Sequence, residues 1–160
     1  MKWLLLIVGL AGGVYAYGIH VANPEHIADP VYAESRVDVE IAQLGRELEY
    51  VFVGEMVSEE DCSQRAERYL EHLFKECKEC NVKRLRCKRD LAQRYKKLFH
   101  GHTTHTTFLS FDKGNRFERN ARMVIWGLNE KEAEMACEQI KKEVKKSYEG
   151  VVRCVGGRLS

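Results

Sequence analysis

One amphipathic helix pattern occurs twice in this chain, each time among short β-rich segments, and this arrangement limits the possible folds most strongly. Helix starts are predicted at Ser58 and at Asn129, which lie 71 positions apart. At that offset, apolar positions of the first helix fall on apolar positions of the second, for example Tyr69 on Ile140. Since any two amphipathic helices can be brought into phase, the order of the flanking strands carries more weight than the offset.

Short β-rich segments flank both helices. Strict alternation at residues 36–41 favours a half-buried strand, although Val37 and Ile41 also have helical spacing. Four further segments are apolar and β-rich, at residues 48–53, 106–111, 121–126 and 151–155. This order predicts an α+β, ferredoxin-like βαββαβ domain, with two helices on one face of an antiparallel sheet.

Residues 81–104 interrupt this pattern, and we interpret them as a helical basic insertion. Five of its cations are expected to contact an anionic partner: Lys83, Arg84, Arg86, Lys88 and Arg89. That partner could be an acidic protein, a lipid surface or a glycan. Tyr95 is the main aromatic residue among these cations, so base stacking and nucleic-acid binding are not expected. The alternative is a solvated helix face.

The amino-terminal segment is apolar. Residues 3–19 contain no charged side chain, which predicts a transmembrane anchor at 1–22, a linker at 23–34 and an extracytoplasmic domain at 35–160. Lys2 favours a cytoplasmic amino terminus, with the domain outside, most simply in a bacterial inner membrane and periplasm. The alternative is a cleaved signal peptide, which would also export the domain.

Small residues recur inside this segment at a spacing of four. Gly9 and Gly13 form one such pair, and Gly12 and Ala16 form another. Small residues at this spacing let two helices approach closely in lipid, so these four positions are candidates for helix packing. The alternative is that glycine is simply common in membrane helices.

Six cysteines constrain the exported domain: Cys62, Cys77, Cys80, Cys87, Cys137 and Cys154. An even number outside the cytoplasm predicts disulfides. The assumed topology brings the helix that holds Cys137 above the last strand, which predicts a pair with Cys154. If the insertion folds back along the first helix, Cys87 approaches Cys77 or Cys80. The partner of Cys62 stays open.

The cysteines have two alternative functions. The C-x-x-C of Cys77 and Cys80 could be a redox pair, but it lies at the carboxy-terminal end of a helix, where the dipole opposes a thiolate. Cys77, Cys80 and Cys87 with His100 or His102 could bind zinc. Disulfides are favoured over both, so no metal and no cofactor is expected.

Residues 51–54 and 123–127, before the two main helices, resemble the strand-to-helix turns of SPOR domains. SPOR domains are small βαββαβ modules that bind peptidoglycan, often on single-span membrane proteins, so the resemblance implies a glycan partner. Inner-membrane platform subunits of secretion and pilus machines have a similar plan, with one span and a ferredoxin-like domain.

The sequence has no nucleophile elbow, phosphate loop or dinucleotide fingerprint, so it gives no argument for an enzyme. The leading hypothesis is a structural or assembly subunit that contacts the lipid bilayer and other membrane or envelope proteins. The alternative is a SPOR-like module that binds peptidoglycan or another polyanion. A third hypothesis is a cysteine-based redox or zinc protein.

Overall fold

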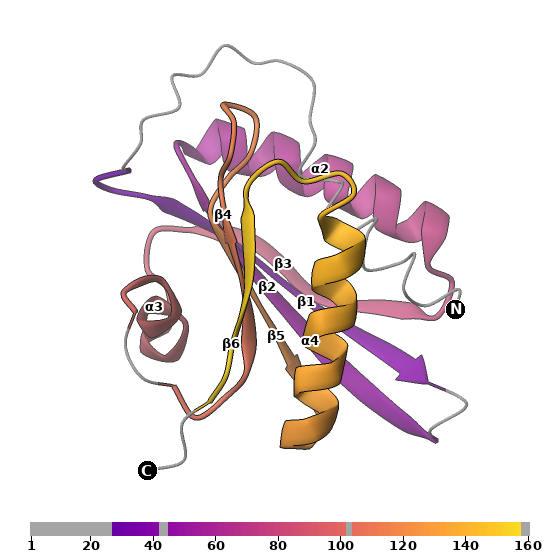
Figure 1. Cartoon of the computed structure of the whole chain (residues 1–160). Helices are drawn as coiled ribbons and strands as arrows, with labels where there is room; N and C mark the ends of the chain where they lie inside the picture. The colour runs from indigo at the N-terminus through magenta and orange to yellow at the C-terminus, as the bar shows by residue number, and fades with distance from the viewer. Residues whose placement is uncertain (1–26, 42–44, 102–103, 158–160) are drawn as a thin grey trace.

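The computed structural model describes residues 27–41, 45–101 and 104–157, except for the side chains of 72–74 and 76. Its centre is an antiparallel sheet with the strand order β3-β1-β2-β5-β4-β6 (Figure 1). The strands are β1 (Val31–Ile41), β2 (Arg46–Met56), β3 (Cys80–Lys88), β4 (Phe108–Asp112), β5 (Ala121–Trp126) and β6 (Val151–Val155). The described helices are α2 (Glu59–Glu76), α3 (Gln93–Phe99) and α4 (Glu130–Val144).

The sheet consists of two ββαβ units that are joined edge to edge. In the first unit, the chain forms the β1–β2 hairpin and then crosses over β1 through α2 to reach β3. In the second unit, it forms the β4–β5 hairpin and crosses over β4 through α4 to reach β6. We call these the N-terminal and C-terminal halves. The strand order is unchanged when each strand is exchanged for its counterpart and the sheet is turned around.

The two halves meet where β2 pairs with β5. Phe52 lies directly opposite Met123 in this antiparallel pair, and these two positions are themselves 71 apart in the sequence. A pseudo-twofold axis therefore passes between Phe52 and Met123. The junction has the geometry of a symmetric homodimer interface, in which one surface patch meets its own equivalent.

Both main helices begin where the sequence predicted. The backbone N–H of Asp61 donates to Ser58 Oγ at 3.1 Å, and the Asp61 carboxylate accepts a bond from the N–H of Val57 at 3.2 Å. Before α4, Asn129 and Glu132 exchange the reciprocal bonds of a capping box, at 3.0 and 2.9 Å. These bonds satisfy amide groups that have no partner inside the helix.

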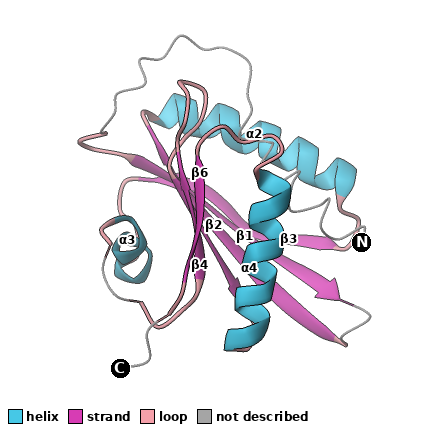
Figure 2. Ribbon diagram, viewed as in Figure 1, coloured by secondary structure: helices cyan, strands magenta, loops and turns pink. Residues whose placement is uncertain are grey.

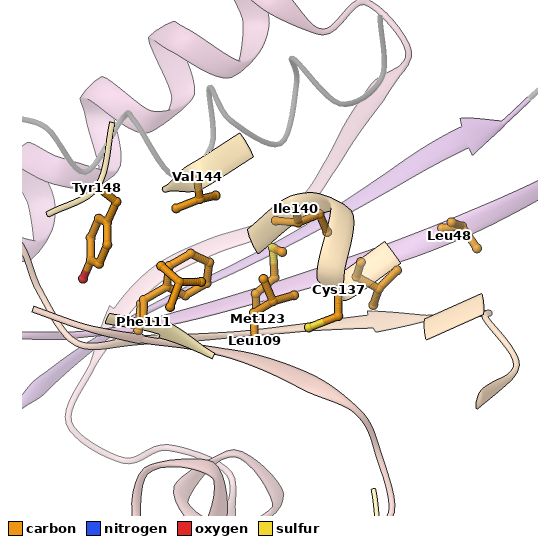
Figure 3. Packing of buried hydrophobic residues seen from close by; sticks show 11 residues of the cluster. Leu48, Leu109, Phe111, Met123, Cys137, Ile140, Val144 and Tyr148 are labelled. Carbon is orange, nitrogen blue, oxygen red and sulfur yellow. The ribbon is translucent and has the colours of Figure 1, made fainter. Parts of the chain in front are cut away.

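Helices α2 and α4 lie on one face of the sheet, and α3 lies on the other (Figures 1 and 2). Under α4, eleven buried residues form one cluster. Figure 3 shows Cys137, Ile140 and Val144 of this cluster pointing from α4 onto the sheet. All of its members except Leu48 come from the C-terminal half.

The core under α2 is divided. Two clusters of four buried residues each fill this space, one around Val37 and Tyr69 and the other around Met56 and Cys62. The Ser35 hydroxyl donates a buried hydrogen bond to the Tyr69 hydroxyl at 3.1 Å. Burial raises the pKa of Tyr69 to about 12, so its hydroxyl stays neutral. The N-terminal half thus contains a polar contact in its helix-side core.

A buried ion pair connects the two halves. Arg119, just before β5, donates to both carboxylate oxygens of Asp61 in α2, at 2.9 and 3.2 Å. Arg65 donates to the same carboxylate at 2.7 Å. Burial raises the pKa of Asp61, but the bonds from Arg119 and Arg65 outweigh burial and leave that pKa below its ordinary value. Asp61 is therefore ionised and held by both halves.

The predicted fold class is wrong. A ferredoxin-like βαββαβ domain has four strands, whereas the described residues form six, because each unit starts with a hairpin. No helix in the described part of the chain is long and apolar enough to cross a membrane. The expected helix at residues 1–22 and its packing positions Gly9, Gly12, Gly13 and Ala16 lie outside the described residues.

Two boundaries also differ from the sequence predictions. Residues 81–88 of the expected helical insertion belong to strand β3, and only residues 93–99 of it are helical. The physical reason is that apolar Leu85 and Cys87 alternate with basic Arg84, Arg86 and Lys88, which is the period of a strand. Strand β1 begins at residue 31, inside the segment 23–34 that was expected to be a linker.

Candidate functional site

Strand β3 aligns three cations on the α3 face of the sheet. Arg84, Arg86 and Lys88 occupy alternate positions, so their side chains point to the same side. Their partners in β1 are Arg36, Glu34 and Tyr32, respectively. We call Arg36, Arg84, Arg86 and Lys88 the cationic strip.

Glu34 lies at the centre of this strip and is only 1% exposed. Its carboxylate accepts a bond from Arg36 Nε at 2.9 Å and forms an ion pair with Lys88. Arg86 and Arg84 lie farther from the same carboxylate, at 3.8 and 4.0 Å. Burial raises the pKa of Glu34, but the bonds from Lys88 and Arg36 lower that pKa by more than burial raises it. The pKa therefore lies below its ordinary value, and the group is ionised.

Arg36 is held from several sides. Besides Glu34, it donates to the Glu49 carboxylate at 3.3 Å and to the Tyr95 hydroxyl at 3.1 Å. Its guanidinium lies 5.5 Å from the centre of the Tyr95 ring, and the guanidinium of Arg94 lies 4.7 Å from the same ring. Tyr95 therefore couples the strip to helix α3.

Helix α3 is in turn fixed on the sheet by Arg122 of β5. The guanidinium of Arg122 donates to the Leu98 carbonyl at 3.0 Å and lies 4.8 Å from the centre of the Phe99 ring. Tyr95 and Leu98 pack into a buried cluster with Val53 and Val124. The short helix thus presents Tyr95 to the strip from a rigid position.

The strip leaves positive charge at the surface. Arg84 and Arg86 are 46% and 48% exposed, whereas the two cations closest to Glu34 are 17% and 18% exposed. Because Arg36 and Lys88 already bind the Glu34 carboxylate closely, the guanidinium groups of Arg84 and Arg86 retain the capacity to bind another anion.

The structure divides the five cations that the sequence singled out. Arg84, Arg86 and Lys88 converge on one carboxylate, whereas Lys83 and Arg89 do not. Lys83 pairs with Asp38 at 2.8 Å. Arg89 pairs with Asp29 at 2.6 Å and with Glu59 at 3.5 Å, so neither cation belongs to the strip.

Sequence reasoning missed Glu34, Arg36 and Tyr95 as members of the site. Residues 31–34 were assigned to a linker, which removed Glu34 from consideration, and Arg36 was read only as a polar position of a strand. The available signal was the alternation of Glu34 and Arg36 with Ala33, Ser35 and Val37, which extends the strand pattern by several residues.

A second feature of the α3 face is a cavity of about 220 Å³ beside α3. Tyr95, Leu98, Val124 and Trp126 contribute its apolar walls. The polar lining comes from Arg94, Lys97, Thr104, His105 and Thr106. A single water needs about 10–15 Å³ in the same measure, so the cavity has room for a small organic molecule.

All six cysteines are paired in the structure, which supports the predicted disulfides. Cys137 is bonded to Cys154, the pair that the expected position of the last helix favoured. Cys87 is bonded to Cys62, and not to Cys77 or Cys80 as expected. The reason is that β3 runs back along α2 toward its amino-terminal end, where Cys62 lies.

Cys77 and Cys80 are bonded to each other across the turn between α2 and β3. With Cys87 bonded to Cys62, the cysteines considered as zinc ligands have other partners. Among the described residues, no group of three or more histidine, cysteine or acidic side chains could hold a metal ion. His102 lies outside those residues.

Comparisons of the chain with protein-family models, with curated proteins and with solved structures found no match.

Proposed function

We propose that this chain is a disulfide-bonded interaction module that binds an acidic protein segment on its cationic strip. One observation carries the proposal: four cations converge on the single buried carboxylate of Glu34, and two of them, Arg84 and Arg86, remain about half exposed. Three disulfides support a working environment outside the reducing cytoplasm.

The arrangement is suited to recognition because it is already organised. Glu34 fixes Arg36 and Lys88, and Tyr95 supports Arg36 from the α3 side. Arg84 and Arg86, the cations left for an anion, project from a paired strand beside the same carboxylate, at 4.0 and 3.8 Å. They therefore lose less conformational freedom when an anion arrives than they would on a flexible loop. Arginine guanidinium groups also bind carboxylates in a bidentate manner, which favours a carboxylate partner over a diffuse negative surface.

The test measures binding of poly-L-glutamate to the intact, oxidised chain at low salt. Arg84→Glu combined with Arg86→Glu should weaken binding at least about tenfold, because each change replaces attraction with repulsion. Raising the salt concentration should also weaken binding.

The matched control is Lys141→Glu combined with Lys146→Glu, in α4 and just beyond its carboxy-terminal end, where both lysines pair with acidic residues of that helix. It changes the net charge equally and should leave binding within about twofold of the original. If both double variants lose the same affinity for poly-L-glutamate, binding depends on net charge alone and the proposed site is wrong. If the chain sediments with peptidoglycan sacculi but does not bind poly-L-glutamate, the partner is a glycan and not an acidic protein.

The cavity beside α3 favours a second candidate function, the binding of a small anionic molecule with an aromatic ring. Trp126 lines the cavity, and Arg94 and Lys97 supply positive charge. A Trp3→Phe variant would leave Trp126 as the one tryptophan of the chain. Saturable change of its fluorescence with benzoate or phenyl phosphate, lost in Lys97→Ala, would support this function. An unchanged signal would exclude it for these probes.

A further inference from the structure

We infer that the free edge of β3 is a strand-addition site, which takes an extended segment with acidic residues at alternate positions. This inference rests on the proposed function and adds to it the conformation and the residue pattern of the partner.

The position of β3 in the sheet provides the first argument. It is the terminal strand in the order, and it pairs with β1 on one side. Within the part of the chain that the structure describes, no strand pairs with its other side. An edge of this kind presents unpaired backbone N–H and C=O groups, which a partner strand can use. β3 has nine residues, whereas the opposite edge strand, β6, has five.

Charge on the α3 face provides the second argument. An added strand would place its side chains about 4.5–5.5 Å from those of Arg84, Arg86 and Lys88. Carboxylates opposite Arg84 and Arg86 would each meet a half-exposed guanidinium group, and a third would lie beside Lys88, which already pairs with Glu34. A second copy of β3 would instead bring arginines and lysines together, and like charges opposite each other destabilise a strand pair. The strip therefore disfavours self-association and favours an acidic segment.

The other face of β3 defines what lies between the acidic residues. Val82, Leu85 and Cys87 are half-buried there and pack against the clusters under α2. Because side chains alternate along a strand, every second residue of the partner would meet this apolar side. The expected motif is therefore acidic–apolar–acidic–apolar–acidic.

An irregularity in the pairing of β3 with β1 limits the length of the site. The pairing register between β1 and β3 shifts between Arg36 and Val37, just beyond the partner of Arg84. Lys83 follows this point, and its charge is engaged by Asp38 at 2.8 Å. The regular stretch available to a partner therefore covers residues 84–88, which matches five residues of an added strand.

The experiment uses the peptide Thr-Glu-Val-Glu-Val-Glu-Thr and the intact, oxidised chain. Two further peptides carry backbone N-methyl groups, one on the glutamates and the other on the valines. Both keep every side-chain charge. The N–H groups of alternate residues in a strand point to opposite sides, so only one of the two peptides loses the groups that face β3. One N-methylated peptide should bind at least about tenfold more weakly, and the other should bind nearly as well as the parent.

Each other outcome has a defined meaning. Equal binding of both N-methylated peptides, or equal binding of a scrambled peptide with its three glutamates in a row, would overturn strand addition while the proposed function stands. Failure of all peptides together with failure of poly-L-glutamate would overturn both. Binding to anionic lipid vesicles without binding to any peptide would also overturn both.

Discussion

The N-terminal and C-terminal halves share one ββαβ plan but use it differently. The C-terminal half packs ten of the eleven residues in the largest apolar cluster, and apolar Phe108 and Val124 lie on its α3 face. The N-terminal half has a divided core under α2, and its α3 face carries Glu34 and the cationic strip. Both halves bury apolar side chains, but the C-terminal half packs them in one continuous cluster under its helix, whereas the N-terminal half gathers several cations around one buried carboxylate.

The disulfides follow the same plan with one offset. Cys62–Cys87 joins α2 to the edge strand β3, and Cys137–Cys154 joins α4 to the edge strand β6. At the offset of 71 residues, Cys137 corresponds to Ala66, one helical turn after Cys62. Each half therefore has a disulfide between its helix and its edge strand, but the two helical cysteines lie one turn apart in equivalent positions.

The largest effect is expected from a substitution that removes the buried ion pair between the halves. Asp61→Ala should lower the free energy of unfolding by about 4 kcal/mol, because it leaves Arg119 buried without its carboxylate. Urea denaturation would measure the loss. The double variant Asp61→Ala with Arg119→Met removes both charges and should recover part of it. A double variant that is less stable than the single one would show that the charge pair is not the cause.

The next largest effect is expected from the disulfides that join a helix to an edge strand. Removing one of them at a time compares how much each stabilises its half. The double changes Cys62→Ala with Cys87→Ala, and Cys137→Ala with Cys154→Ala, should each cost about 3 kcal/mol, because the separations of 25 and 17 residues are similar. Thermal unfolding would test this.

Binding should separate the same two variants. Loss of Cys62–Cys87 frees β3 from α2 and should weaken poly-L-glutamate binding, whereas loss of Cys137–Cys154 should not. If both variants bind equally well, the assignment of binding to the N-terminal half would be wrong.

A matched pair of core variants sharpens the contrast in packing. Val144 and Val37 are both fully buried, one in the continuous cluster and the other in a cluster of four. Val144→Ala should cost about 2.5 kcal/mol and Val37→Ala about 1.5 kcal/mol, because the cost depends on how far the surroundings relax into the space. Chemical denaturation of both variants gives the difference. The reverse order would contradict the contrast between a continuous core under α4 and a divided core under α2.

The smallest expected effect is a pH dependence that originates in the N-terminal half. The pKa values of Asp61 and Glu34 lie below their ordinary values of 3.8 and 4.5, because hydrogen bonds to cations outweigh burial. Their contribution to stability is complete above those ordinary values and is lost as the pH falls through the lower folded values.

Unfolding midpoints measured between pH 7 and pH 3 should therefore decline below about pH 4.5, near the upper ordinary value of 4.5. Hydrogen exchange should increase in β1 and α2 before it increases in β4 and α4. Glu34→Gln should reduce the decline. A decline that begins in α4 would assign the pH dependence to other groups.

Much of the secondary structure was accessible from the sequence because it depends on local signals. Ser58 and Asn129 are strong caps, and the periodicity that follows each one identified both long helices. The repeat at 71 residues was also a true signal of two related units. The expected four-strand arrangement is wrong because residues 81–88 were interpreted as part of a basic helical insertion, although apolar and basic residues alternate with a period of two over 84–88.

The site was only partly accessible. Arg84, Arg86 and Lys88 stood out as charges, but their common partner Glu34 comes from a strand 50 residues or more earlier in the chain. Which cations converge depends on the register between β1 and β3, and that register follows from tertiary packing. The partner of Cys62 was open for the same reason, since it required the direction of β3 along α2.

The position of the disulfides has a consequence for how the chain acquires them. Cys62, Cys77, Cys80 and Cys87 pair among themselves in the first half, and no pair between described residues crosses to the second. Six cysteines have fifteen possible pairings, but four have only three. Since chains emerge from the ribosome amino terminus first, the first half can complete its oxidation before Cys137 and Cys154 arrive. The boundary between the halves thus shortens the search for correct pairs, which reduces the need for an isomerase.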